Sequence, residues 1–162
     1  MYIGQIIYAI LSNDGGVSPL VYDGNTENTF RIFPIRVPIS ADQLPLIVFE
    51  GDDANPDITL QQNTGLVKQR VRIDCLSADY DDANTLGRLV YNAMNVPKGV
   101  YGNVQVAGIF YKNESENEET LPGMGESVQT YIKSLEYLIC YYFPTPEQQS
   151  SPYSFGFSGG FQ

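Results

Sequence analysis

The clearest pattern of hydrophobic and polar residues runs from position 67 to position 75 and has a period of two. One set of alternate positions is apolar apart from a single glutamine: Val67, Gln69, Val71, Ile73 and Cys75. The other set is charged throughout: Lys68, Arg70, Arg72 and Asp74. Such alternation is typical of a β-strand that rests one face on a hydrophobic core. We therefore predict a strand over 67–75 whose outward face is largely basic.

A helix is predicted directly after this strand, because the period changes. Small and apolar side chains now recur at helical spacing, at Ala83, Leu86, Gly87, Val90 and Met94. Ser77 or Asp79 can accept a first-turn backbone N–H and so cap the helix. Asp81 and Asp82 complement the positive end of the helix dipole.

Up to residue 143 the pattern predicts one further helix and four further strands. A stripe of isoleucines predicts a helix over 2–11, and extended segments are predicted over 31–38, 46–50, 103–112 and 128–142. The prolines of 31–38 suit an edge strand. In 103–112, Val104, Val106 and Phe110 are expected on one face. Apolar residues on both faces near the end of 128–142 predict burial on both sides.

Two polar segments separate these elements. Residues 51–65 are interpreted as a long hairpin connection into the central strand, and they carry Asp52, Asp53 and Asp57. The spacing of these aspartates lacks the EF-hand pattern, so the calcium-site interpretation is weak.

The densest run of charge lies in 113–120, and its carboxylates are Glu114, Glu116, Glu118 and Glu119. We interpret this run as a solvated hairpin loop. The alternative is that the carboxylates at its tip contact a basic partner surface.

Composition narrows the possible classes of function. The 162 residues include 9 Lys and Arg against 19 Asp and Glu, and the resulting net charge of −10 works against binding to nucleic-acid phosphates. The lack of histidine removes the commonest metal ligand and rules out Ser-His and Cys-His nucleophile pairs. We expect no cofactor, no metal site and no enzymatic activity. Cys75 and Cys140 are expected to be reduced and buried, with a disulfide between neighbouring strands as the alternative.

Nothing in the sequence predicts a membrane segment. No apolar run approaches the ~20 residues that span a bilayer. The N-terminal stretch lacks the basic start of a secretory signal. The expected compartment is a cytoplasm, or a particle assembled in one.

The chain is expected to form one domain over 1–143, followed by a flexible tail over 144–162 that is rich in glycine, serine and aromatic residues. The aromatic residues of this tail are Tyr153, Phe155, Phe157 and Phe161. They either dock on a neighbouring subunit or belong to a disordered terminus.

Three stretches resemble one protein family, the tail-completion or tail-terminator proteins of long-tailed bacteriophages. The first is 31–34 followed by 44–49, the second is 71–75 followed by 80–83 and its helix, and the third is the aromatic closing strand 131–142. The likeness rests on their order and spacing, since none is a catalytic fingerprint. The tail after Phe143 is longer than the family pattern requires.

The resemblance implies an α+β fold, with an antiparallel sheet of about four to five strands and two helices packed on one face. It also implies a homo-hexameric ring that sits at the head-proximal end of the tail tube in the virion and is assembled in the host bacterial cytoplasm. Such a ring stops tube polymerisation, contacts the tube protein and the head-completion or connector protein, and lets viral DNA pass without specific binding.

In such a ring, the basic row of Lys68, Arg70 and Arg72 is a candidate for pairing with an acidic neighbouring surface. The alternative for this row is a solvated strand face balanced by cross-strand carboxylates. The alternative for the whole chain is a small cytoplasmic binding or regulatory protein of similar architecture that forms no ring.

Overall fold

The computed structural model describes residues 2–24, 29–34, 43–58, 63–122 and 127–143, with the side chains of 55–58, 63, 64 and 122 left out of the description. In chain order the elements are α1 (Tyr2–Ser12), α2 (Ser18–Val21), β1 (Ile32–Pro34), β2 (Leu46–Gly51), β3 (Asn55–Ile58), β4 (Asn63–Ser77), α3 (Tyr80–Ala93), β5 (Gly99–Tyr101), β6 (Val104–Pro122) and β7 (Ser127–Tyr142).

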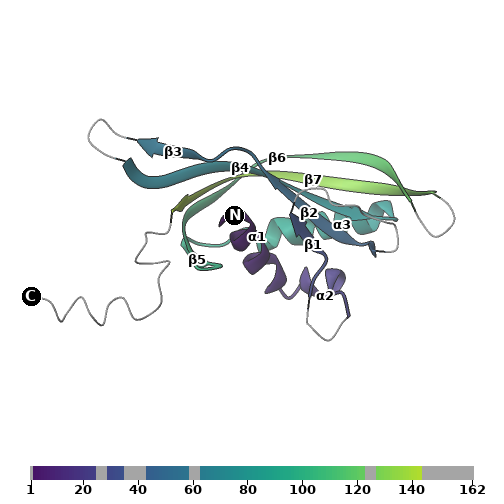
Figure 1. Cartoon of the computed structure of the whole chain (residues 1–162). Coiled ribbons are helices and arrows are strands. Elements are labelled where there is room, and N and C mark those ends of the chain that lie inside the picture. The colour runs from purple at the N-terminus through teal and green to yellow at the C-terminus, as the bar shows by residue number, and fades with distance from the viewer. Residues whose placement is uncertain (1, 25–28, 35–42, 59–62, 123–126, 144–162) are drawn as a thin grey trace, which may run out of the picture.

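Across these ranges the strands form one sheet in the order β1-β2-β4-β7-β6-β5, with β3 paired to one end of β4. Figure 1 shows the strands as a long curved layer, with α1 and α3 beneath it. The α+β class and the placement of these two helices on one face therefore agree with the prediction. The described sheet has seven strands rather than four to five, because β3 forms within the polar segment 51–65 that was expected as a connection and β5 forms over 99–101, where no strand was predicted.

The sheet is not antiparallel throughout. β1 runs parallel to β2, with Ile32 opposite Ile47. Arg31 fixes this edge: its carbonyl accepts from the Ile47 N–H at 2.9 Å, and its guanidinium donates to the carbonyls of Pro45 and Tyr22, each at 2.9 Å. This contact with the start of β2 holds β1 in the parallel direction. The proline-containing segment is an edge strand, as predicted.

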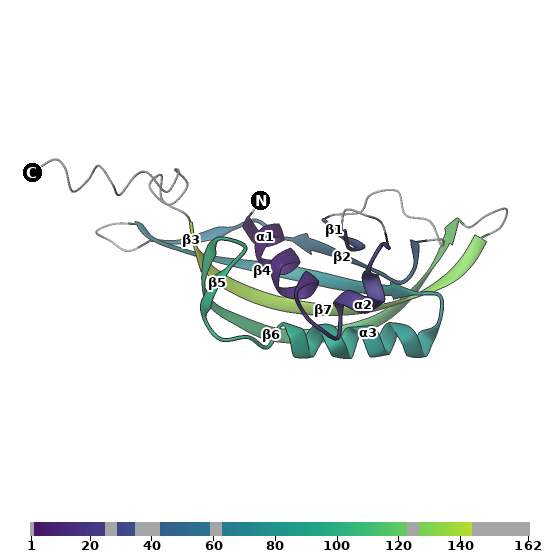
Figure 2. The ribbon, with the colours of Figure 1, turned by 90° about the horizontal axis from the view of Figure 1, so that it is seen from below.

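The central strand follows its predicted pattern closely. Its inward residues are all buried: Val67, Gln69, Val71, Ile73 and Cys75. They form one hydrophobic core with α1 and α3, and Figure 2 shows both helices lying across the strands on this face. Gln69 is satisfied there, because its Oε1 accepts a 2.8 Å hydrogen bond from the Tyr141 hydroxyl and its Nε2 donates to the Asp52 carbonyl.

The junction between β4 and α3 also forms as expected. Asp79 caps the helix, since its Oδ1 accepts from the backbone N–H groups of Asp81 at 2.8 Å and Asp82 at 3.1 Å. Ser77 supports the cap, because its Oγ accepts from the N–H of Asp79 at 3.3 Å. Both residues named as candidate caps therefore take part.

One facing prediction was wrong. Val104 and Val106 are buried against the helices, but Phe110 is 52% exposed and pairs with Leu138 on the opposite face. The pairing of β6 with β7 shifts between Val106 and Gly108, which is a β-bulge. The extra residue reverses the inward and outward positions that follow it.

Cys75 and Cys140 are free and buried, as predicted. They belong to opposite faces of the sheet, because Cys140 pairs with the outward Lys68 whereas Cys75 lies in the core beneath the helices. Burial raises the pKa of both thiols, which keeps them protonated and unreactive. Among the described residues, no helix is long and apolar enough to cross a bilayer.

We predict that Val71→Asp or Ile73→Asp abolishes soluble expression. Each places an unpaired carboxylate among core side chains, at an expected cost above about 4 kcal/mol. The matched control is Arg70→Asp on the exposed face of the same strand, which should express and melt near the wild-type temperature. If Val71→Asp or Ile73→Asp is as stable as this control, these residues do not face the core.

Candidate functional site

The basic row lies on the face of the sheet that carries no helices, which we call the outer face. Its three members differ in their surroundings. In the sheet register, Arg72 lies opposite Glu50 on β2 and opposite Glu136 on β7. Its Nη2 lies 3.2 Å from the Glu50 carboxylate and its Nε lies 3.2 Å from Asp74. The interpretation as a strand face balanced by cross-strand carboxylates is therefore correct for Arg72.

Asp74 lies on the outer face, as expected from the alternation of β4. Its side chain is nevertheless buried there, at 4% exposed. It accepts a 2.7 Å hydrogen bond from the Ser134 hydroxyl in addition to its contact with Arg72. A small second hydrophobic cluster surrounds this part of the outer face and comprises Leu46, Val48, Leu76, Leu121 and Ile132. The outer face is thus closed at one end.

The other end of the outer face is open. Lys68 and Arg70 are exposed, and within the described residues neither forms an ion pair. Arg70 pairs with Leu138, which pairs in turn with the exposed Phe110. We call Lys68, Arg70, Phe110 and Leu138 the outer patch. It combines apolar area with two cations that lack a carboxylate partner among the described side chains, a composition suited to contact with an acidic protein surface.

The acidic run is not a loop. Residues 113–120 belong to β6 and pair with β7 from Asn113–Glu136 to Pro122–Ser127. Glu114, Glu116 and Glu118 therefore all face the helix side of the sheet, whereas Glu119 faces the outer side. The strict alternation of Glu with Asn and Ser could have indicated a strand. The described pairing ends at Pro122 opposite Ser127, and residues 123–126 lie outside the described residues.

Lys133 organises the carboxylates of this strand. Its Nζ lies 3.4 Å from Glu114 and 3.3 Å from Glu116, and the Tyr80 hydroxyl donates a 2.8 Å hydrogen bond to Glu116. These bonds, first that from Tyr80 and then that from Lys133, hold the pKa of Glu116 below its usual range. Burial acts to lower the pKa of Lys133, but the two glutamates outweigh it and leave that pKa raised.

The same lysine also sets the distance between α3 and the sheet. Its aliphatic stem crosses α3 at Gly87, where an added Cβ would come within 2.5 Å of the Lys133 Cγ. Beside it, the ring of Tyr111 makes edge-to-face contacts with the rings of Tyr91 and Tyr137, with centroid separations of 5.1 and 5.7 Å. Nothing in the local sequence around Gly87 or Lys133 indicated this contact, which depends on strand pairing.

The remaining sequence candidates do not form a shared site. Asp52 and Asp53 lie in the exposed connection after β2, and the backbone N–H of Asp52 donates to the Arg70 carbonyl at 2.9 Å. Asp57 lies on β3, and its side chain is outside the description. The tail aromatics lie in 144–162, also outside the described residues. The described ranges hold no group of three or more His, Cys, Asp or Glu placed to bind a metal ion.

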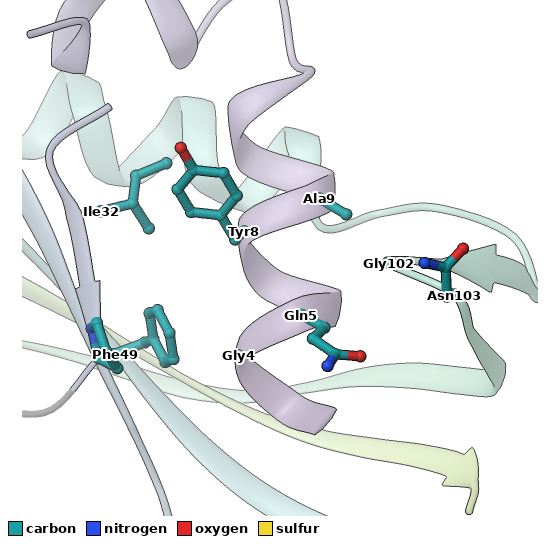
Figure 3. Close-up of a pocket in the computed structure, with 9 residues that line it drawn as sticks. Gly4, Gln5, Tyr8, Ala9, Ile32, Phe49, Gly102 and Asn103 are labelled. Atoms are coloured by element: carbon teal, nitrogen blue, oxygen red, sulfur yellow. The ribbon is translucent and has the colours of Figure 1, made fainter. Parts of the chain in front are cut away.

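A large hollow that the sequence did not indicate crosses the exposed side of α1. It measures about 830 Å³. Figure 3 shows Tyr8 and Phe49 on the side toward β1 and β2, and Ala9 on the side toward the β5–β6 turn. That turn approaches α1 closely at Gly102, where φ is +60° and an added Cβ would lie 2.3 Å from the Gln5 carbonyl oxygen. The residues that line the hollow are Gly4, Gln5, Tyr8, Ala9, Ile32, Pro34, Phe49, Gly102 and Asn103.

The fold is shared with a known virion component. No protein-family model matches the sequence, and no curated protein matches it. Among solved structures, the chain is similar to one from the virion of a native gene transfer agent (GTA) particle, with a TM-score of 0.63 and 14% sequence identity. The match covers 87% of this chain and 95% of that chain. At this identity the likeness concerns the fold.

We predict that Lys133→Met lowers the melting temperature at pH 7 by about 2–4 °C, because two carboxylates lose their shared cation while the stem over Gly87 is kept. Since the pKa of Glu116 is lowered in the folded state, its stabilising contribution is present above the ordinary glutamate pKa and is lost as the pH falls. The difference from wild type should therefore shrink between pH 7 and pH 3 in thermal melts.

The control for this measurement is Lys98→Met, which removes an exposed ammonium that forms no ion pair within the described residues. It should melt like the wild type at both pH values. A Lys133→Met difference that is unchanged at pH 3 would assign the effect to packing rather than to charge.

Proposed function

We propose that this protein is a structural component of a phage-type virion that caps the head-proximal end of a tail tube as a ring. In this role it terminates tube polymerisation and offers the surface on which head and tail join. The observation that carries the proposal is the fold shared with a chain of a gene transfer agent virion over nearly the full length of both chains. The order and spacing of the three family-like stretches support the same role.

The proposed role is one of assembly, without chemical turnover. The sequence has no histidine, and the exposed charged groups described above form ion pairs and an open patch rather than a nucleophile with its base. Binding between surfaces is then the mechanism. The expected partners are further copies of the chain, the tail-tube protein and the head-completion protein.

Two dissimilar surfaces favour a head-to-tail contact between copies. The outer patch is basic and apolar, whereas Glu114, Glu116 and Glu118 form an acidic row on the opposite face of the sheet and further along β6. Lys133 balances only part of that acidic row. A contact between unlike surfaces repeats from copy to copy, and it gives a closed ring when the rotation between neighbouring copies closes. The net charge of −10 suits a channel through which DNA slides without binding.

The first test is the mass of the protein in native buffer, alone and after mixing with purified tail tubes. A six-membered ring of the 18.0 kDa chain has a mass of about 108 kDa. A ring in solution, or a monomer that assembles on tube ends, supports the proposal. A monomer that ignores tube ends contradicts it and favours a small binding or regulatory protein.

We predict that Lys68→Glu with Arg70→Glu prevents ring formation or tube capping while leaving the melting temperature close to wild type. Both side chains are exposed, so reversal of their charge changes a surface rather than the core. The matched control is Arg88→Glu with Lys98→Glu, which makes the same charge change on exposed positions of the helix side. Equal loss of assembly in both double variants would remove the outer patch from the interface.

A further inference from the structure

The hollow across α1 lacks any charged residue among the side chains that line it in the described structure. Tyr8 is 38% exposed and offers an aromatic wall, whereas Ile32 and Phe49 belong to the core and present only 4% and 3% of their surface there. Gly4 and Ala9 are small residues of its lining (Figure 3). The side-chain amides of Gln5 and Asn103 and the hydroxyl of Tyr8 are polar groups of its lining. A surface of this kind accepts an uncharged, aromatic occupant that also presents peptide groups.

The chain itself contains a segment with that chemistry. Residues 148–162 carry no charged side chain, although the protein as a whole has a net charge of −10. Within this segment Tyr153, Phe155 and Phe157 occupy alternate positions, separated by Ser154 and Gly156. In an extended conformation three aromatic rings therefore lie on one face and only small groups on the other.

The described part of the chain ends beside the hollow. The ring of Phe143 packs against that of Tyr2 at 5.7 Å between centroids, at the start of α1. The hollow begins at Gly4 and reaches Ala9, and a rise of about 1.5 Å per residue places the Tyr8 backbone roughly 9 Å along the helix from Tyr2. The ten residues from Phe143 to Tyr153 span up to about 33–36 Å when extended.

We propose that the segment from Tyr153 to Phe157 binds in this hollow on its own subunit. The tail is long enough to reach it, and a short tether gives an effective concentration in the millimolar range, which a neighbouring free subunit does not match. The aromatic face then packs mainly on the exposed ring of Tyr8, over the edges of Ile32 and Phe49, and the amides of Gln5 and Asn103 bond to the peptide groups of the segment. This differs from both alternatives that the sequence left open, docking on a neighbouring subunit and a disordered terminus.

The test uses the full chain with Tyr153→Trp. The protein has no tryptophan, so fluorescence then reports on this single position. We expect emission blue-shifted relative to a free peptide of residues 148–162 carrying the same substitution, and quenching by acrylamide several-fold weaker. Because the contact is intramolecular, both signals should persist throughout a dilution series. Phe155→Ser with Phe157→Ser in the reporter chain should abolish the shift.

The hollow is tested with Tyr8→Glu in the reporter chain, which removes an aromatic wall and introduces a charge. The matched control is Tyr91→Glu on α3, since the two helical tyrosines are similarly exposed, at 38% and 44%. Docking predicts loss of the blue shift in the first variant and its retention in the second, with circular dichroism confirming that both fold. If Tyr8→Glu does not fold, the tail variant and the dilution series decide the matter.

Three results would overturn the proposal: emission equal to that of the free peptide, a blue shift that Tyr8→Glu leaves unchanged, or a shift that disappears on dilution. The last would assign the segment to a neighbouring copy. None of these readouts requires a ring, so the docking and the proposed function can fail separately. A mass of about six chains together with emission like that of the free peptide would reject the docking of the tail and leave the ring proposal standing.

Discussion

The pairing of β4 with β7 is the constraint on which the other elements depend. It runs without a bulge from Leu66 opposite Tyr142 to Ser77 opposite Tyr131. Because both strands are flanked by further strands, their side chains are held on fixed faces, one toward the helices and one toward the outer patch. β4 leads directly into the Asp79 cap, so the same pairing also sets the starting point of α3. A slip of one residue would exchange the core for the basic row.

A second layer of organisation is electrostatic and acts between elements rather than within them. Lys133 stands on β7, and it holds the glutamates of β6 on one side while its stem rests on α3 at Gly87. The pairing of β6 with β7 makes the acidic run a strand, and Lys133 offsets the charge of two of its carboxylates. The outer patch is basic, whereas the glutamates on the helix side of β6 are acidic. Two surfaces of opposite charge on one subunit allow each copy to bind the next in the same orientation.

The molecule therefore separates stability from interaction. Its hydrophobic core is buried and α3 is capped by Asp79, whereas the outer patch and the hollow across α1 remain open in the described structure. The open surfaces differ in chemistry, since the patch is cationic and the hollow is uncharged. An acidic protein surface suits the first, and the segment 148–162, which has aromatic but no charged side chains, suits the second. Neither arrangement calls for a reacting group, which is consistent with a role in assembly.

The sequence by itself determined α1, β4, α3 and its Asp79 cap, because periodicity and capping are local properties of neighbouring residues. It also determined the outward basic row and the two buried thiols. The alternation in the acidic run was compatible with a strand, but the tertiary structure decided its partner on β7, and the register shifts of β6 decided which residues face outward, Phe110 among them. The hollow across α1 was equally out of reach, because it arises where segments distant in sequence meet around one helix.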